Sequence, residues 1–575
     1  MKIALQFLAA SMLLSSVGLI PLNAAVATGE KTEVNQEIKS VVPEKSATDP
    51  APPQPSEPPP SAAPSEEMTE TDEAVDSEAD QAVDFVKNIE GLTLQHRLNA
   101  DDAPQPIKQV KADPLILLQT FKQDVMAMLQ AHPKPLKITS EIKLLFSESF
   151  SKQVGELPSV TVQTEIDAEG KGRSNIVLPA YQHEEPAAGE VKKFLIDFKG
   201  MAGQSEFTED FANFGYRIDF SGLTVEEENQ YKIVWDKTTL EGKLDADLIA
   251  VKAAVNLSKM ELTHSQDSFK ILMENGSSET VLEKLKNAVE VHTGNFKLGK
   301  FELQQGDTQG KMDRLEMTFG GTEQADQVGF FLNTKFNGAL LPKEVLGESL
   351  TLHYNGQLAL QSLAAEPVVA LQQAAREFER QRLKGGISEN MMYLMLFNKV
   401  MEIAPKLAVK SPELALNDLN LKTNYGQLIG KMTVGLDGAK FKSLTDIDSL
   451  LMSLQTQADF TISQKLLQKF LAMLLSEPSV TDDKTPDKKS SKEAIEKQAK
   501  QQADEGIREL LSEKWLVEEG ENYRFVASLK NNSFIVNGAP KPSPLNDFMV
   551  VPPPPPSPSE AQSGQGTPPV SEVKH

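Results

Sequence analysis

The chain has 575 residues, enough for two or three domains. It carries 82 acidic against 58 basic residues, a formal net charge of −24, and it has no cysteine. These figures exclude a disulfide scaffold, a cysteine-ligated metal centre and a thiol nucleophile, and they argue against a protein that binds bulk nucleic acid. The mean hydropathy of −0.32 excludes a polytopic membrane protein.

The N-terminus has the pattern of an export signal. Lys2 precedes an apolar run over residues 3–20, and Ala25 and Ala27 form an Ala-x-Ala site. We therefore predict that residues 1–27 are a signal peptide cleaved after Ala27. The alternative is an uncleaved anchor, because about 18 apolar residues are near the lower limit for crossing a bilayer. Both interpretations place the rest of the chain outside the cytoplasm.

Two segments have the composition of disordered polypeptide. Residues 28–80 hold 14 acidic residues, three lysines and nine prolines, and no aromatic residue. Such a segment buries too little apolar surface to offset the entropy of ordering. We predict a disordered acidic Pro-rich linker over residues 28–84 and a disordered Pro-rich tail over residues 549–575. Each is a spacer or solvated tail, or alternatively a docking ligand for another protein.

The middle of the chain is dominated by alternation of apolar and polar residues, which predicts half-buried antiparallel strands. Residues 194–198, 216–220, 231–235, 315–319, 350–354 and 428–436 all show it. Gly-containing groups that favour tight turns are expected to separate the strands. They are Glu274-Asn275-Gly276, Phe319-Gly320-Gly321, Tyr354-Asn355-Gly356 and Leu436-Asp437-Gly438.

Helices are expected in clusters. One begins at Glu366-Pro367, and a second is capped by Ser388 and ends before Pro405. Ser463 is expected to cap a third helix. A fourth follows a capping box of Ser490 and Glu493 and leads to two final strands, over residues 523–529 and 534–537.

Together these patterns predict an α+β fold: an elongated, predominantly antiparallel β-sheet meander with clustered covering helices and disordered N- and C-terminal segments. An N-terminal mixed region over residues 85–185 is expected to precede a sheet-rich domain over residues 186–548. The order strand–strand–helix occurs around residues 296–383 and again around 414–475. That recurrence indicates either a duplication or the similarity that all strand meanders share.

No motif predicts catalysis or cofactor binding. Residues 294–300 approach the phosphate-binding P-loop, but Phe301 follows the lysine where Ser or Thr is required, and the segment reads as a strand. Ser149 and Lys152 match the Ser-x-x-Lys spacing of penicillin-interacting serine enzymes without the companion motifs. They are the candidate nucleophile and base if the protein is a serine hydrolase, a function that we treat as a minor alternative to a non-catalytic role.

Metal binding is not predicted either. The histidines are His96, His132, His183, His264, His292, His353 and His575, and none has a local partner at ligand spacing. We expect them to be solvated residues of strand faces or loops. Asp245 and Asp247 flank Ala246, but without a third carboxylate they are expected to lie on a solvated strand face.

One apolar run remains as a candidate contact surface. Residues 391–397 are hydrophobic on every side of a helix, so the helix cannot be half exposed unless it meets something apolar. Core packing is one interpretation. The other is a groove for an apolar ligand or partner, since methionine adapts to irregular contacts. The candidate contact residues are Met391, Met392, Leu394, Met395 and Phe397.

Two stretches resemble the YdgA-like family of Gram-negative envelope proteins, a domain of unknown function. One is Pro-Glu-Leu-Ala-Leu-Asn-Asp-Leu over residues 412–419 with Asn-Tyr-Gly-Gln over 424–427. The other is the order of terminal helix, Trp515-Leu516-Val517, hairpin and Asn537-Gly538. The resemblance covers residues 190–540. It implies an envelope protein at the periplasmic face of the inner membrane that self-associates, with no catalytic residue to carry over, although the acidic spacer departs from the family pattern.

We therefore expect a periplasmic protein, exported by its signal peptide or anchored in the inner membrane if residues 1–27 are retained. Its expected role is non-catalytic: binding or envelope maintenance with a lipid or a membrane-protein client. The alternative is a self-assembling structural protein whose sheet edges pair between copies. A homo-oligomer, no nucleic acid, no metal and no cofactor are expected.

Overall fold

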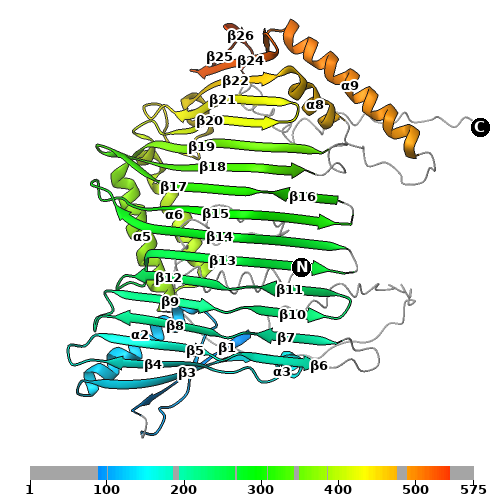
Figure 1. Ribbon diagram of the computed structural model, residues 1–575. Helices are drawn as coiled ribbons and strands as arrows, with labels where there is room; N and C mark the ends of the chain where they lie inside the picture. The colour runs from blue at the N-terminus through cyan, green and yellow to red at the C-terminus, as the bar shows by residue number, and fades with distance from the viewer. Residues whose placement is uncertain are drawn as a thin grey trace, which may run out of the picture.

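The computed structural model describes residues 89–99, 102–185, 193–265, 268–306, 308–341, 349–384, 386–475 and 488–543. Most of them belong to one antiparallel β-sheet whose strands stack along the long axis of the molecule (Figure 1). The predominantly antiparallel fold predicted from alternation is confirmed. The cleavage site at Ala25 and Ala27, the linker up to residue 84 and the tail from residue 549 lie outside the described residues.

The sheet follows chain order with few exceptions. Its main ladder runs β2–β1–β3–β4–β5–β8–β9–β12–β13–β14–β15–β17–β18–β19–β20–β21–β22–β24–β25–β26. A second ladder, β6–β7–β10–β11–β13, extends the lower strands on one side. The strands are β1 (Ile89–Leu98), β2 (Lys108–Val110), β3 (Leu136–Phe146), β4 (Val160–Ile166), β5 (Gly172–Leu178), β6 (Tyr181–Glu185), β7 (Phe194–Phe198), β8 (Met201–Phe207), β9 (Phe214–Phe220), β10 (Leu223–Glu227), β11 (Tyr231–Trp235), β12 (Thr238–Leu244), β13 (Ala250–His264), β14 (Phe269–Lys284), β15 (Glu290–Gln305), β16 (Thr308–Met312), β17 (Arg314–Gln324), β18 (Gln327–Leu341), β19 (Leu350–Ala364), β20 (Glu413–Thr423), β21 (Gly426–Leu436), β22 (Leu454–Ser463), β23 (Val517–Glu519), β24 (Asn522–Lys530), β25 (Ser533–Val536) and β26 (Ala539–Lys541).

The strands share a break near their middle. Between β9 and β10 the break falls at Ser221-Gly222, and in β14 it falls at Asn275, whose φ is 56°. Across each break the residues that face the same side are three apart instead of two. Examples are Phe220 and Leu223, Trp235 and Thr238, and Leu298 and Phe301. The aligned breaks let each long strand bend while its apolar residues stay on one face.

The two faces of the sheet differ in chemistry. We call the side that carries Leu240, Phe296 and Leu332 the apolar face, because cross-strand pairing places apolar residues opposite one another there from β1 to β25. The other side, the polar face, carries cross-strand ion pairs such as Arg217 with Glu241 and Lys252 with Glu279. The alternation read from the sequence therefore separates a solvated charged face from one that must be covered.

Three of the four predicted turns are wrong, because those glycines lie inside strands. Gly276 is in β14, Gly320 is in β17 and Gly356 is in β19. Several strand glycines instead sit beneath an aromatic ring of the neighbouring strand, which fills the space a side chain would take. The directly paired examples are Gly172 with Phe207, Gly242 with Tyr216, Gly294 with Phe319, Gly320 with Phe331 and Gly430 with Phe460.

We expect Gly242→Ala to destabilise the sheet. The added Cβ would lie 2.6 Å from the Lys252 carbonyl oxygen and 2.7 Å from the Tyr216 hydroxyl. Overpacking of this kind costs about 1–3 kcal/mol. Urea denaturation should show this loss, whereas Gly310→Ala, whose Cβ would come no closer than 3.7 Å to any atom, should change the free energy of unfolding by less than about 0.5 kcal/mol. Equal effects at the two glycines would contradict the ring-over-glycine account.

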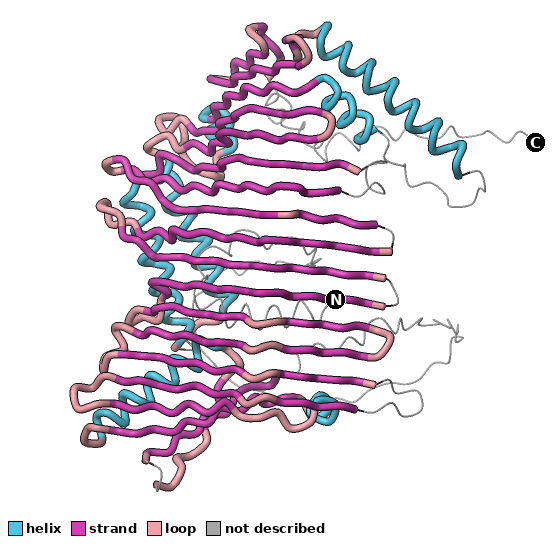
Figure 2. The backbone as a smooth tube through the Cα atoms, viewed as in Figure 1, coloured by secondary structure: helices cyan, strands magenta, loops and turns pink. Residues whose placement is uncertain are grey.

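The described helices are α2 (Pro114–Ala131), α3 (Glu148–Val154), α5 (Ala365–Leu383), α6 (Glu389–Ala408), α7 (Ile447–Ser453), α8 (Gln464–Leu475) and α9 (Lys488–Ser512). Figure 2 shows α5 and α6 side by side, crossing the strand direction from the level of β18 to that of β12. Ser388 caps α6 as predicted, with its hydroxyl accepting from the Met391 amide at 3.3 Å.

Three details of the predicted helices are wrong. Helix α6 continues through Pro405 to Ala408, because the proline falls in its last turn, where the neighbouring Ile403, Ala404 and Ala408 are buried. Ser463 precedes α8, but its hydroxyl accepts from the Gln427 amide of β21 at 3.0 Å instead of capping the helix. Helix α9 begins at Lys488, so the expected capping box falls inside it.

The largest core lies between α2 and the first strands. Val125 and Phe121 of α2 pack against Ile138, Ile166 and their neighbours on the apolar face. Asp113 starts this helix by accepting from the Leu115 amide at 2.8 Å. A smaller core joins Val368 of α5 to Val291 and Val328 at the ends of β15 and β18. These two cores place α2 and the α5–α6 pair on the sheet.

Candidate functional site

A Ser–His–Asp arrangement lies beneath α2. The Nδ1 atom of His96 in β1 is 2.8 Å from the Ser140 hydroxyl in β3, and its Nε2 atom is 3.1 Å from Asp124 Oδ2 in α2. Lys108 forms a further ion pair with Asp124. These are the residue types of a nucleophilic triad. The serine and histidine are 0% and 2% exposed, however, so a substrate cannot reach the hydroxyl.

The arrangement therefore works as a buried polar network that ties α2 to the sheet. It also corrects the expectation that the histidines are solvated. His96 faces the apolar side of β1, and burial is compatible with an imidazole there because both ring nitrogens have partners. Burial lowers the pKa of His96, and it does the same for His292, which lies near Glu290 and Arg376.

This lowered pKa predicts a dependence of stability on pH. Below its ordinary pKa of 6.5 the unfolded chain protonates His96 while the folded chain holds it neutral. The stabilisation is therefore complete above about pH 6.5 and is lost as the pH falls toward the folded-state pKa. We expect the free energy of unfolding to decline between pH 6.5 and 5, and the decline to be smaller in His96→Asn. An identical pH slope in the two proteins would rule out this assignment.

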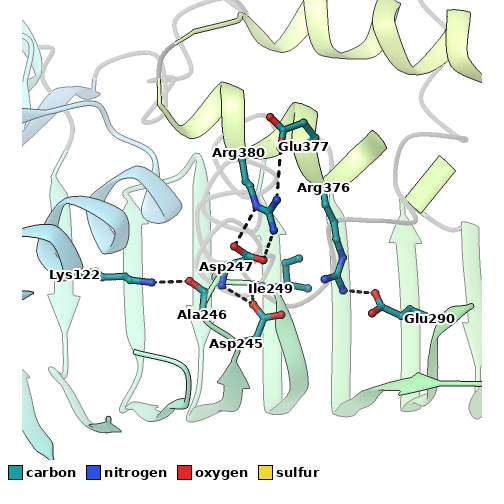
Figure 3. Close-up of polar contacts among 9 residues, drawn as sticks. All are labelled: Lys122, Asp245, Ala246, Asp247, Ile249, Glu290, Arg376, Glu377 and Arg380. Atoms are coloured by element: carbon teal, nitrogen blue, oxygen red, sulfur yellow. Dashed lines mark hydrogen bonds and ion pairs between the residues drawn. The ribbon is translucent and has the colours of Figure 1, made fainter. Parts of the chain in front are cut away.

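A second polar cluster joins α5 to the sheet at the ends of central strands (Figure 3). Arg380 binds Asp247 with two hydrogen bonds, Nη2 to Oδ2 at 2.6 Å and Nε to Oδ1 at 3.2 Å. Arg376 pairs with Glu290 at the start of β15, and Gln372 accepts from the Glu290 amide at 3.1 Å. The Arg380 guanidinium holds the pKa of the Asp247 carboxyl below its usual range.

A third arginine continues this series. Arg382 pairs with Asp113, the residue that caps α2, at 3.1 Å, and with Glu379 at 2.7 Å. We call Arg376, Arg380 and Arg382 the arginine clasp. They link α5 to three separate elements, which are β15, the turn between β12 and β13, and α2.

Asp245 and Asp247 do not lie on a strand face as predicted. They form the turn between β12 and β13, where Asp245 Oδ1 accepts from the amides of Asp247 at 3.0 Å and Ile249 at 2.9 Å. Lys122 of α2 donates to the carbonyl of Ala246 in the same turn at 2.6 Å (Figure 3). This turn is a junction between α2, α5 and the sheet.

The apolar run of α6 is not a packed core helix. Met391, Leu394 and Phe397 are 48%, 54% and 60% exposed, and Tyr393 beside them is 45% exposed. Met392 and Met395 are half-buried. The interpretation that buries all of these side chains is therefore wrong, while the contact role predicted for them stays a prediction.

Apolar side chains are also exposed on the apolar face of the sheet. Leu358 and Leu360 of β19 and Leu414 of β20 are 43%, 37% and 46% exposed and pair across the two strands, with Leu360 directly opposite Leu414. Leu358 also lies opposite Leu332 of β18 and Leu416 of β20. The result is an exposed leucine cluster on the apolar face.

The remaining sequence candidates lie in regular secondary structure. Residues 294–300 lie within β15, as the strand interpretation predicts, and Ser149 and Lys152 fall in α3. Among the described residues, no group of three or more acidic or histidine side chains converges as a metal site would require. None of the described helices is both long and apolar enough to cross a bilayer.

Comparison with known proteins places the chain in a family. Residues 126–544 match the model of a family described as bacterial proteins of unknown function (DUF945), so the chain belongs to that family. The matched region begins well before the stretch that resembles YdgA-like proteins, and it contains most of the sheet, the arginine clasp and α6. No curated protein and no solved structure is significantly similar to the chain.

Proposed function

We propose that this protein is an exported envelope protein that binds an acyl-chain lipid on the apolar face of its sheet, without catalysis. The observation that carries the proposal is the exposed leucine cluster formed by Leu358, Leu360 and Leu414. A soluble protein rarely leaves neighbouring leucines on one sheet face in water, and such patches mark ligand or partner sites. Flexible acyl chains can lie along such a surface.

The polarity of the sheet supports a ligand on this side. The opposite face carries cross-strand ion pairs, and covering paired charges with an apolar molecule costs free energy. The leucine cluster continues across three neighbouring strands. Its directly paired residues are Leu332, Leu358, Leu360, Leu414 and Leu416. An apolar ligand would therefore meet an uninterrupted apolar surface.

The ends of the sheet favour this role over assembly by edge pairing. The last strand, β26, has three residues and includes Pro540, which cannot donate to a further strand. At the other end β2 also has three residues. Short edges and an edge proline protect a sheet against addition of strands from another copy.

Export is part of the proposal and rests on the Ala-x-Ala pattern at Ala25 and Ala27. N-terminal sequencing of the protein isolated from cells tests it. A mature chain that begins at Thr28 indicates release into the periplasm, and a retained Met1 indicates an anchored protein. A chain recovered only from the cytoplasm would contradict the proposal.

The lipid is tested by purification without detergent followed by solvent extraction and mass spectrometry. We expect a diacyl lipid at a constant molar ratio to the protein after size-exclusion chromatography. Protein that is folded, yet free of lipid when purified from envelopes, would remove the basis of the proposal.

A further inference from the structure

We infer that the first half of α6 is a membrane-contacting surface that lies in the headgroup region of an anionic phospholipid bilayer. This surface shares no residue with the leucine cluster, so the inference does not depend on the proposed lipid site. It consists of Met391, Tyr393, Leu394 and Phe397, which are 45–60% exposed. Met391, Leu394 and Phe397 are three residues apart, which places them along one side of the helix.

The residue types are those of an interfacial helix. No charged residue occurs between residues 391 and 398, and an aromatic ring and a phenol stand beside methionine and leucine. Side chains of this kind enter the boundary between headgroups and acyl chains. Helix α6 has 20 residues but contains charges in its second half, which fits a helix that lies on a bilayer and does not cross it.

Charge complementarity identifies the occupant. Residues 365–410, which include α5 and α6, contain seven Lys+Arg and five Glu in a chain whose net charge is −24. The three arginines of the clasp and Lys410 pair with acidic residues of other elements. Lys384 at the connection between the helices and Lys406 in the last turn of α6 are both exposed. These two lysines are exposed cations on a strongly acidic protein, and an anionic membrane attracts them.

The arginine clasp sets the position of this surface. It fixes α5 to the sheet through Arg376, Arg380 and Arg382, and α6 packs along α5. The guanidinium groups of the clasp are used in these contacts, whereas the exposed lysines lie near the two ends of α6. The apolar stripe along Met391, Leu394 and Phe397 is therefore presented on a fixed support, with an exposed lysine near each end of α6.

Vesicle sedimentation with the full chain tests the inference. We expect binding to phosphatidylcholine vesicles that contain about one third phosphatidylglycerol, weaker binding to phosphatidylcholine alone, and weakening by salt. The double variant Leu394→Ser with Phe397→Ser should bind the anionic vesicles roughly thirtyfold less. Ile107→Ser with Ile447→Ser is the matched control, since these side chains are 62% and 63% exposed elsewhere, and it should bind like the parent.

A local probe separates this contact from binding by the apolar N-terminal residues. In a Tyr393→Trp variant, the new tryptophan adds to the fluorescence of the parent protein. That added fluorescence should shift to shorter wavelength when anionic vesicles are present. Lys384→Glu with Lys406→Glu should lower binding to anionic vesicles alone. Unchanged sedimentation of the serine variant, or no emission shift at residue 393, would overturn the inference. So would a change in oligomeric mass of the serine variant with vesicle binding intact, because a second copy would then cover the stripe.

Discussion

Replacing Leu358 and Leu414 with glutamine is expected to strip the protein of co-purified lipid. The two leucines are about half exposed, so each offers roughly 1–1.5 kcal/mol of further apolar burial to a ligand. Losing both weakens binding by about 2–3 kcal/mol, a factor of roughly 30 to 150. Mass spectrometry of solvent extracts, normalised to protein, measures the loss.

The opposite face supplies the control for this experiment. Ile429 of β21 and Val177 of β5 are 42% and 48% exposed on the polar face, so Ile429→Gln with Val177→Gln replaces two apolar side chains of similar exposure. That variant should retain its lipid, and both variants should unfold at nearly the parent urea concentration. Equal loss of lipid from the two variants would show that the leucine cluster is not the site.

The second large effect is expected at the arginine clasp. Arg380→Gln with Arg382→Gln leaves Asp247 and Asp113 without their guanidinium partners. Arg382 is largely buried and Arg380 is half exposed, so we expect a loss of about 2 kcal/mol, most of it at residue 382. Hydrogen exchange should show that the amides of α5 and α6 lose roughly thirtyfold in protection while those of β13 and β14 keep theirs.

A surface arginine provides the comparison. Arg314 pairs with Glu316 on the polar face and is 59% exposed, so Arg314→Gln should change the free energy of unfolding by less than about 0.5 kcal/mol. Protection that falls evenly over the whole sheet in the clasp variant would mean that α5 is not an independently held element.

The strands could be predicted from the sequence because alternation reports which face a residue occupies. Phe194, Ile196 and Phe198 form β7, and Tyr231, Ile233 and Trp235 form β11, as expected. The sequence predicts turns at glycines that lie inside the long strands, because Asn-Gly and Gly-Gly favour turns locally. Whether a glycine lies beneath an aromatic ring, as Gly294 does beneath Phe319, depends on the register between two strands. That register cannot be read from one stretch of sequence.

The apolar residues of α6 stand out by composition, but the polar clusters could not be predicted from the sequence. His96, Asp124 and Ser140 come from three elements, and nothing in their local spacing indicates that they meet. The clasp left a weak signal, since Arg376 and Arg380 are four residues apart on one side of a helix. Their acidic partners lie far away in sequence, so only the fold brings them together.

Photo-crosslinking from the sheet is the most direct test of lipid binding. A benzophenone amino acid placed at residue 358 on the apolar face, in cells fed a radiolabelled fatty acid, should give a labelled protein after irradiation. The same amino acid at residue 429 on the polar face should give none. Labelling at both positions or at neither would contradict the account that the apolar face holds an acyl-chain lipid.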